Sequence, residues 1–501
     1  MWALADRGSK SASRDLAVID VGSNSVRLVL FRVEGRAIWP VFNEKVLAGL
    51  GRDLPETGRL SPDGVQAALA ALRRFRAVLD GVRPSAVFAA GTAAVRLAED
   101  GPDFVAKVRK QTGLKVRVLA GEEEARLSAL GVAAGIPGAA GLVGDLGGSS
   151  LELVRLDSGA PHTGVTLPLG PFAMGAPDRF DPSFIRRAVD EALSGVDGRF
   201  HAESFFAVGG AWRNIALMHM SLGDYPLRIL HEYALTGAEA LETARFVARQ
   251  SHASLERVPG VSRKRAETLP YAAVVLEGLI ERLGISRVTI SAFGLREGLV
   301  FEALPEAIRA RDPLIEGSML LGERQGGVEA LGPALDAWLA PFWKKLDPVF
   351  EGGREAVLVA AACRLADLGA RLHPDHRADL VFDQVLRAPF AGVDHAERTF
   401  LAVAAHARHT AQAVDSVAVS RLLTPERFRR ARSLGLAMRL GCDLSGRSPP
   451  LLSRARLTLE KGAAVLTADK ANADLLLGEQ TAKRLATFAQ SMDLGAKMRP
   501  S

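Results

Sequence analysis

The feature that most constrains the fold of this chain is an internal repeat. An apolar strand, a turn rich in glycine and serine, and a second apolar strand occur at residues 16–31 and again at residues 141–156. The equivalent positions in the two copies are Asp20 and Asp145, Gly22 and Gly147, and Ser25 and Ser150. Two copies of a hairpin led by an aspartate predict two similar domains that face each other across a cleft.

Each copy is followed by patterns typical of alternating strands and helices. Residues 86–90, 205–208 and 288–292 are short apolar runs that predict strands, and residues 63–79 carry apolar side chains at helical spacing. This alternation predicts an α/β sheet in each half. Ligands of such sheets collect at the carboxyl ends of the strands, where glycines follow here.

The amino-acid composition changes after about residue 305, where alanine, leucine and arginine dominate. Residues 333–413 have a mostly helical pattern, and we expect breaks at Pro341, Pro374 and Pro389. A smaller mixed region follows. We therefore divide the chain into a first domain (1–135), a second domain (136–305) and a mainly helical C-terminal domain (306–501).

Composition narrows the class of partner. The 501 residues carry a formal net charge of +6, which suits a polyanion. The two cysteines form no CxxC pair, so we expect neither a disulfide framework nor a cysteine zinc site. We expect the protein to work in a reducing compartment, the cytoplasm. The polar residues 1–14 do not resemble a signal peptide, and no run of about 18 apolar residues predicts a membrane span. No nucleic-acid motif is recognised.

The two hairpin turns are candidate phosphate cradles, because glycine allows backbone N–H groups to approach phosphate oxygens closely. One such turn alone is typical of an ordinary hairpin. Two turns in register, each led by an aspartate, predict a phosphate site. The candidate phosphate ligands are Gly22, Ser23, Asn24, Ser25, Gly147, Gly148, Ser149 and Ser150, with Gly209 and Gly210 after the strand at 205–208 and the arginines Arg96 and Arg213.

Carboxylates are placed beside these turns. Asp20 and Asp145 end the strands that lead into the turns, where they could hold a hydrated magnesium ion. Glu152 takes the place of Arg27 in the repeat, and on a strand leaving the turn it can share the cleft-facing side of Asp145. We therefore expect Asp20, Asp145 and Glu152 to form the metal-binding set.

Three consecutive glutamates, Glu122, Glu123 and Glu124, open a predicted helix. The helix dipole favours acidic residues in a first turn whatever their function. A glutamate in a phosphate cleft could also be the general base that activates water. The sequence leaves open which of the three points inward.

Together these residues resemble the exopolyphosphatase / guanosine pentaphosphate phosphohydrolase family, within the superfamily of sugar kinases, actin and heat-shock chaperones. Six motifs in the family's order carry the resemblance, at residues 20–28, 90–96, 121–126, 144–152, 207–213 and 293–298. The resemblance implies an α/β fold of two actin-like (ribonuclease H-like) domains forming a cleft, followed by a mainly α-helical HD-like C-terminal domain.

The resemblance also implies an activity and roles for residues. We expect a magnesium-dependent hydrolase, with potassium as a further candidate ion, that releases orthophosphate from the ends of inorganic polyphosphate. Guanosine pentaphosphate (pppGpp) is the alternative substrate, alone or in a bifunctional enzyme. By resemblance, Glu124 is the favoured catalytic residue with Glu123 next, Asp145 and Glu152 associate with metal, and Arg96 contacts phosphate. Family members also suggest a homodimer.

The C-terminal domain departs from the HD pattern. An HD centre needs His and His-Asp clusters that bind metal, but the expected His-Asp position reads Ala366-Asp367. Residues 366–377 look like the version in alphaproteobacterial exopolyphosphatases. We therefore expect this domain to be non-catalytic and to serve chain binding or dimerisation.

Rival interpretations remain open at this stage. A kinase of the same superfamily would transfer phosphate to an acceptor. A binding regulator with an inactive site would hold the ligand without turnover. Phosphate release without an acceptor distinguishes the hydrolase from both.

Overall fold

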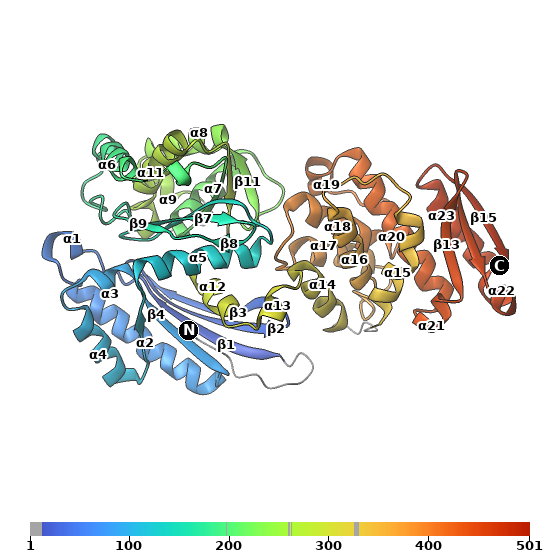
Figure 1. Ribbon diagram of the computed structural model, residues 1–501, viewed down its shortest axis with the longest axis horizontal. Helices are drawn as coiled ribbons and strands as arrows, with labels where there is room; N and C mark the ends of the chain where they lie inside the picture. The colour runs from blue at the N-terminus through green and yellow to red at the C-terminus, as the bar shows by residue number, and fades with distance from the viewer. Residues whose placement is uncertain (1–12, 197, 259–260, 262, 325–329, 501) are drawn as a thin grey trace. The chain divides into compact units, whose positions relative to one another are not determined.

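The computed structural model describes residues 13–500 except for residues 197, 259–260, 262 and 325–329. The chain divides into two compact units, Met1–Arg311 and Asp312–Ser501, and each is described by itself. The finer division of the first unit at residue 135 stays a prediction. The two units appear in Figure 1 with the chain coloured from blue to red.

The first unit begins with a five-stranded sheet in the order β3-β2-β1-β4-β5. β1 to β3 are antiparallel, and β4 and β5 run parallel to β1. The strands are β1 (Arg14–Val21), β2 (Val26–Glu34), β3 (Ala37–Val46), β4 (Ala86–Gly91) and β5 (Arg117–Val118). The helices are α1 (Leu54–Thr57), α2 (Pro62–Val82), α3 (Ala93–Leu97) and α4 (Gly101–Thr112). The predicted helix at 63–79 is α2, which buries Leu69, Leu72, Phe75 and Leu79.

A second sheet follows in the order β11-β12-β10-β6-β7-β8, with β9 paired to β7. Its strands are β6 (Gly141–Leu146), β7 (Leu151–Asp157), β8 (Ala160–Pro161), β9 (Val165–Leu167), β10 (Ser204–Val208), β11 (Tyr233–Thr236) and β12 (Arg287–Ile290). The helices of this half are α6 (Pro182–Ser194), α7 (Gly210–Leu222), α8 (Gly237–Ala248), α9 (His252–Glu256), α10 (Arg263–Ala266) and α11 (Leu269–Leu283). The strands predicted at 205–208 and 288–292 are β10 and β12.

The repeat predicted from the sequence is present in three dimensions. β7-β6-β10 in the second sheet repeats the arrangement of β2-β1-β4 in the first. Each hairpin closes with the same backbone hydrogen bond, from Gly22 N to Ser25 O at 3.0 Å and from Gly147 N to Ser150 O at 2.9 Å. Asp145 lies directly opposite Glu152 across the β6–β7 pair, so the two side chains share one face of the sheet as predicted.

Helix α5 (Gly121–Gly135) has apolar residues on both sides and runs between the two sheets (Figure 1). Leu127, Leu130 and Ala134 pack with residues of β1, β2 and α12 (Leu295–Glu302). Ala125, Ala129 and Val132 pack against β6, β7 and β10. One helix is therefore shared by the cores of both halves.

The crossing of α5 and α12 depends on two glycines. A Cβ at Gly298 would lie 1.9 Å from the Leu127 carbonyl oxygen, and one at Gly131 would lie 2.0 Å from that of Gly294. The two backbones can come this close only because neither residue has a side chain. A short helix, α13 (Glu306–Arg309), ends the unit.

The second unit is mainly helical with a small sheet in the order β13-β14-β15. Its helices are α14 (Pro313–Arg324), α15 (Leu331–Trp343), α16 (Arg354–Arg364), α17 (Arg377–Arg387), α18 (His395–Ala407), α19 (Val417–Leu422), α20 (Pro425–Ser445), α21 (Pro449–Leu452), α22 (Ala473–Leu476) and α23 (Glu479–Gln490). The strands are β13 (Ala455–Glu460), β14 (Ala463–Ala468) and β15 (Gly495–Pro500).

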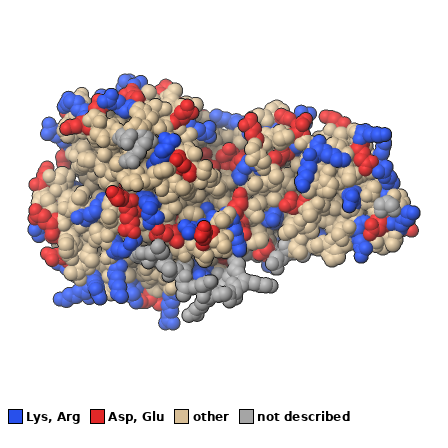
Figure 2. Space-filling model, in the orientation of Figure 1, with Lys and Arg blue, Asp and Glu red and all other residues tan. Residues whose placement is uncertain are grey.

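The prediction of a break at Pro341 is wrong, because α15 continues through this residue to Trp343. Pro341 lies in the last turn, and buried Leu339 and Phe342 on either side of it hold that turn in the core. Pro374 and Pro389 do lie between helices. Across the described parts of both units, no helix is long and apolar enough to cross a membrane. Figure 2 shows acidic and basic side chains interspersed over the face drawn.

Candidate active site

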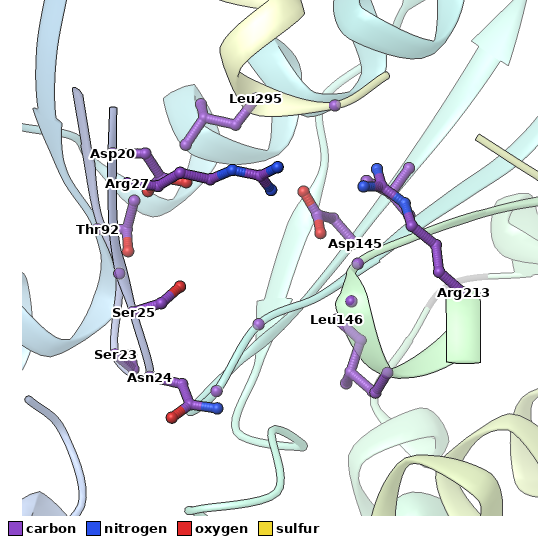
Figure 3. A pocket seen from close by; sticks show the side chains of 18 of the residues that line it. Asp20, Ser23, Asn24, Ser25, Arg27, Thr92, Asp145, Leu146, Arg213 and Leu295 are labelled. Carbon is purple, nitrogen blue, oxygen red and sulfur yellow. The ribbon is translucent and has the colours of Figure 1, made fainter. Parts of the chain in front are cut away.

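A cavity of about 370 Å³ lies in the first unit at the carboxyl ends of β1, β4, β6, β10 and β12 (Figure 3). This is the edge at which parallel α/β sheets hold their ligands. The predicted residues that line it are Asp20, Gly22, Ser23, Asn24, Ser25, Glu124, Asp145, Gly147, Gly148, Ser150, Glu152, Gly209, Gly210 and Arg213. The predicted residues Glu123, Arg96 and Ser149 are not part of this lining.

The two hairpin turns approach each other closely at one wall of the cavity. A Cβ at Gly148 would lie 3.0 Å from the Ser23 Cβ and 3.2 Å from the Asn24 backbone nitrogen. Glycine at this position therefore lets the second turn come against the first. Residues of both turns therefore line the same cavity, which is the arrangement expected of a phosphate cradle.

A helix N-terminus contributes to the same cavity. Gly209 has a φ of 112°, which favours glycine, and it turns the chain from β10 into α7. Gly209, Gly210 and Ala211 line the cavity, so the first turn of α7 borders it. Backbone N–H groups in a first helical turn have no partner within the helix and attract anions.

Glu124 is the glutamate of the triplet that faces the cavity. Its residue is 8% exposed, and its Oε2 accepts a hydrogen bond of 2.7 Å from Nη1 of Arg96, on α3. Glu123 forms an ion pair of 2.8 Å with Arg117 instead, and Glu122 is exposed. Of the three glutamates, only Glu124 borders the cavity, which answers the question of which one points inward.

Arg96 lies behind Glu124. Its Nη1 also donates to the Leu119 carbonyl oxygen at 2.8 Å. The hydrogen bonds to Leu119 and Glu124 together hold the side chain against the N-terminal end of α5. Arg96 thus orients Glu124 in this structure. Its direct contact with phosphate stays a prediction.

Three carboxylates lie together in the cavity wall, with Glu124 and Glu152 buried and Asp145 half-buried. Burial raises the pKa of Glu124 to about 7, and the hydrogen bond from Arg96 opposes that shift. Burial raises the pKa of Asp145, against a 2.5 Å hydrogen bond from the Ser128 hydroxyl. Burial, with the nearby Glu124 and Asp145, raises the pKa of Glu152 well above its usual value. Close carboxylates in a desolvated cleft make a site for protons or a cation.

The carboxylates also fit the donor chemistry of a hard cation. Oε1 of Glu152 is buried and has no hydrogen-bond partner among the described residues. Carboxylate oxygens are the ligands that Mg²⁺ prefers. Within the described part of the chain, however, no three acidic, histidine or cysteine side chains are grouped tightly enough to hold a metal by themselves. The geometry accordingly fits an ion held by few protein ligands and completed by water and phosphate oxygens, which is common for Mg²⁺.

Asp20 has a cationic partner. Nη1 of Arg296, on α12, lies 3.1 Å from Oδ2 of Asp20, and both side chains are largely buried. Asp20 lines the cavity but is neutralised by this pair. Its role in metal binding stays a prediction.

Several cations line the cavity, and most of them were missed by the sequence reasoning. They are Arg27, Lys45, Arg213, Arg265 and Arg296. Loss of water and mutual repulsion lower the pKa of Arg27 and of Arg213 to about 10. Such crowding of like charges predicts a polyanionic ligand that would neutralise them. Arg296 lies in the motif at 293–298, whereas Lys45 and Arg265 belong to none of the six motifs.

Arg213 and Ser149 are two further predicted phosphate ligands, and their surroundings differ. Arg213 donates from Nε and Nη2 to the carbonyl oxygens of Ser291 and Ala292, at 3.1 and 2.8 Å. Its guanidinium nevertheless lies near enough to Asp145 to oppose the rise in the pKa of that carboxyl, and Figure 3 shows both side chains in the cavity. The Ser149 side chain lies near Gly51, whose added Cβ would be 3.2 Å from the Ser149 Oγ. A phosphate contact of this hydroxyl stays a prediction.

Fold and site together define a class: an α/β protein of two ribonuclease H-like halves with a cleft lined by glycine-serine turns, carboxylates and cations. The model of the Ppx/GppA phosphatase family matches residues 29–307, and that of the exopolyphosphatase C-terminal region matches residues 346–498. The chain belongs to the Ppx/GppA phosphatase family. This confirms the predicted family and the predicted actin-like fold with a helical C-terminal region.

Relatives agree with this assignment. Exopolyphosphatase 1 of Mycobacterium tuberculosis is 26% identical over 302 residues, which covers 58% of this chain and 88% of that protein. Exopolyphosphatase 1 of Mycobacterium leprae is 27% identical over 305 residues, covering 58% and 89%. Among solved structures, an exopolyphosphatase from Cytophaga hutchinsonii (22% identity, 57% and 97% covered) has a TM-score of 0.54, which shows the shared fold. The Aquifex aeolicus family member (24% identity, 58% and 97% covered) has a TM-score of 0.50.

Proposed function

We propose that this protein is an exopolyphosphatase, which hydrolyses the terminal phosphoanhydride bond of inorganic polyphosphate and releases orthophosphate. The observation that carries the proposal is the composition of one cavity. Backbone cradles and five cationic side chains bind the polyanion, and one buried carboxylate with a pKa of about 7 stands ready to accept a proton. The family membership and the exopolyphosphatase relatives support the same reaction.

In this mechanism, the Gly-Ser turns and the N-terminus of α7 bind the terminal phosphoryl group. Arg27, Lys45 and Arg265 stabilise the negative charge of the chain that leads to it. Glu124, oriented by Arg96, accepts a proton from water as the water attacks phosphorus in line. The bond to the bridging oxygen breaks, and the shortened chain leaves with its negative charge held by the cations. Positioning and charge stabilisation account for most catalysis of phosphoryl transfer.

We propose magnesium as the cofactor. Asp145 and Glu152 would hold the ion, with Asp20 near it, and potassium is a further candidate cation. A bound magnesium ion would supply charge neutralisation for the phosphate oxygens. The unpartnered Oε1 of Glu152 supports this assignment, because an ionised carboxylate is costly to bury without a cation. Glu152→Gln should therefore raise the magnesium concentration needed for half-maximal activity.

The alternative substrate is guanosine pentaphosphate. The lining of the cavity includes the apolar residues Pro171, Leu217 and Leu230 as well as the polar residues Asn214 and Arg265. Apolar faces with a few polar groups are what a nucleoside requires. This mixed lining favours the alarmone as a second substrate in a bifunctional enzyme.

The deciding experiment is orthophosphate release in magnesium from three substrates at equal concentration of chain ends. The substrates are long polyphosphate, tripolyphosphate and guanosine pentaphosphate. Fastest release from long polyphosphate is the expected result, and fastest release from the guanosine compound would replace it with the alternative. Absence of release from all three would contradict the hydrolase and favour a binding regulator.

We also propose that the protein works in the cytoplasm as a homodimer. The free, buried Cys363 and Cys442 support a reducing compartment. The dimer rests on the resemblance to family members. Light scattering coupled to size exclusion tests it, and a monomer mass at micromolar concentration would contradict it.

A further inference from the structure

A buried serine of helix α5 contacts one of the proposed metal-binding carboxylates. Ser128 is 1% exposed and is not part of the cavity lining. Its hydroxyl donates a hydrogen bond of 2.5 Å to Oδ2 of Asp145, a length typical of a hydroxyl bonded to a carboxylate. Among the described residues, this is the only hydrogen bond or ion pair that either oxygen of Asp145 forms. The orientation of this carboxylate therefore depends on Ser128.

A second contact borders the same oxygen. An added Cβ at Gly294 would lie 3.8 Å from Oδ2 of Asp145, so the N-terminal end of α12 lies beside it. Gly131, three residues after Ser128, packs directly against the Gly294 backbone. Oδ2 is thus bordered by two helices, α5 and α12. Oδ1 forms no hydrogen bond with the described chain and remains available to an ion or to its water shell.

A buried hydroxyl needs a partner, and a helix can usually supply one. Serine and threonine hydroxyls inside helices commonly donate to the carbonyl oxygen four residues earlier. Thr243, Thr399 and Ser445 do so in this protein, each at 2.7 Å. Ser128 instead bonds to a side chain of β6, 17 residues away in sequence. The need for a partner therefore does not by itself explain this contact.

The hydrogen bond also joins the two chemical functions of the site. Glu124 lies four residues before Ser128, so both side chains leave the same face of α5. The bond from Ser128 to Asp145 therefore fixes the proposed base relative to the proposed metal ligand. Carboxylates that bind metal ions are usually oriented by such second contacts, and losing one typically lowers metal affinity or activity about 10–100-fold.

We propose that Ser128 is a positioning residue for the magnesium site, whose hydroxyl holds Asp145 in the orientation that the ion requires. The inference rests on the proposed function, because it takes Asp145 as a metal ligand. It adds a residue that the sequence reasoning did not mark, since Ser128 lies outside the six motifs, two residues beyond the segment 121–126. Ser128 does not line the cavity, so it acts only through Asp145.

The test is direct binding of Mn²⁺, followed by electron paramagnetic resonance as loss of the free-ion signal. Mn²⁺ takes the same oxygen ligands as Mg²⁺, and the measurement needs no turnover. The titration uses the full chain with methylenediphosphonate, which supplies phosphate oxygens and cannot be hydrolysed. Competition by Mg²⁺ in the same titration shows that the two ions share one site.

Substitutions at Ser128 separate its hydroxyl from its packing. Ser128→Ala removes the hydroxyl, and the Kd for Mn²⁺ should rise about tenfold or more. Ser128→Thr keeps a hydroxyl and should restore most of the affinity. If Ser128→Ala does not fold, as judged by thermal unfolding, Ser128→Cys replaces it, because a thiol is only a weak donor. The matched control is Thr243→Val, which removes a buried hydroxyl bonded within its own helix and should leave the Kd unchanged.

The proposal is overturned by an unchanged Kd in Ser128→Ala, by a Kd in folded Ser128→Thr as high as in Ser128→Ala, or by an equal rise in Thr243→Val. Glu152→Gln, measured in the same series, keeps this failure apart from failure of the proposed cofactor. Weaker binding in Glu152→Gln with an unchanged Kd in Ser128→Ala would leave the metal site standing and remove only the role of Ser128. No binding of Mn²⁺ by the wild type would remove both.

Discussion

Arg96 donates one hydrogen bond of 2.7 Å to the carboxylate of Glu124, and that bond works against the burial that raises the pKa of Glu124 to about 7. The arginine belongs to α3 and the glutamate to the first turn of α5, so segments 28 residues apart in sequence meet here. The pair therefore controls both the direction in which the carboxylate points and the pH at which it ionises.

Removing this arginine should move the pH profile. A base is active when deprotonated, so activity should rise with pH through the pKa of Glu124. Arg96 lowers that pKa, and Arg96→Met should therefore shift the acidic limb of kcat/KM to higher pH. Arg96→Lys, which keeps the charge, should shift it less. An acidic limb that stays in place in Arg96→Met would show that another group titrates.

Glu124→Gln should lower kcat about 10²–10⁴-fold, the usual contribution of a general base. The matched control is Glu123→Gln on the same helical turn, whose carboxylate pairs with Arg117 and does not border the cavity. It should lose less than about tenfold, as expected for a residue outside the reacting groups. Steady-state phosphate release measures both. A larger loss in Glu123→Gln would reverse the assignment.

The titration of Lys45 should cause the fall of kcat/KM on the alkaline side of the pH profile. The residue is exposed, yet loss of water at the cavity and the neighbouring Arg265 and Arg27 lower its pKa to about 7. Its charge is present below that pH and lost above it, so binding of a polyanion by the free enzyme should weaken as pH rises. Lys45→Met should raise KM and remove this limb of kcat/KM. A limb that persists in the variant would contradict the prediction.

Gly148→Ala should impair substrate binding more than folding. The added Cβ would press on Ser23 and Asn24 and widen the gap between the two turns. At Gly147 the nearest atom to an added Cβ is the Ser150 carbonyl oxygen at 3.4 Å, so Gly147→Ala should cost less. KM for polyphosphate and thermal unfolding, measured on both variants, check this order. Equal KM values would show that the spacing of the turns is unimportant.

Gly298→Ala should destabilise the first unit by at least about 1–3 kcal/mol, the usual cost of overpacking. Its Cβ would collide with the Leu127 carbonyl oxygen, and backbone cannot move aside as a flexible side chain can. Gly81→Ala in α2 is the control, because nothing lies within 4 Å of its added Cβ. Chemical denaturation measures both, and similar stabilities would refute the tight crossing.

The sequence was most informative where a local pattern decides the structure. The hairpins of Asp20 and Asp145 were predictable, because Gly-Ser turns between apolar strands define their own geometry and the repeat doubles the signal. The orientation of Glu124 was not, because all three glutamates satisfy the helix dipole equally and only packing of α5 between two sheets selects the inward one. The continuation of α15 through Pro341 was missed for the same reason, since buried neighbours outweigh a local propensity.

The cationic lining was the least predictable part of the site. Lys45 is on β3 and Arg265 is on α10, and neither element contains any of the six motifs. A single lysine or arginine in a sequence has no pattern that marks it as inward-facing. Arg296 lay inside a recognised motif, but its pairing with Asp20 spans 276 residues and follows only from the fold.

Helix α5 uses three successive turns for three different contacts. Glu124 reaches the cavity from the first turn, Ser128 bonds to Asp145 from the second, and Gly131 meets α12 from the third. A helix is a stiff rod, and these points span only about 10 Å at 1.5 Å per residue. A rotation of one half relative to the other at the contact between Gly131 and α12 would therefore also move Glu124. A substitution that loosens this contact should misplace the catalytic base before it unfolds the protein.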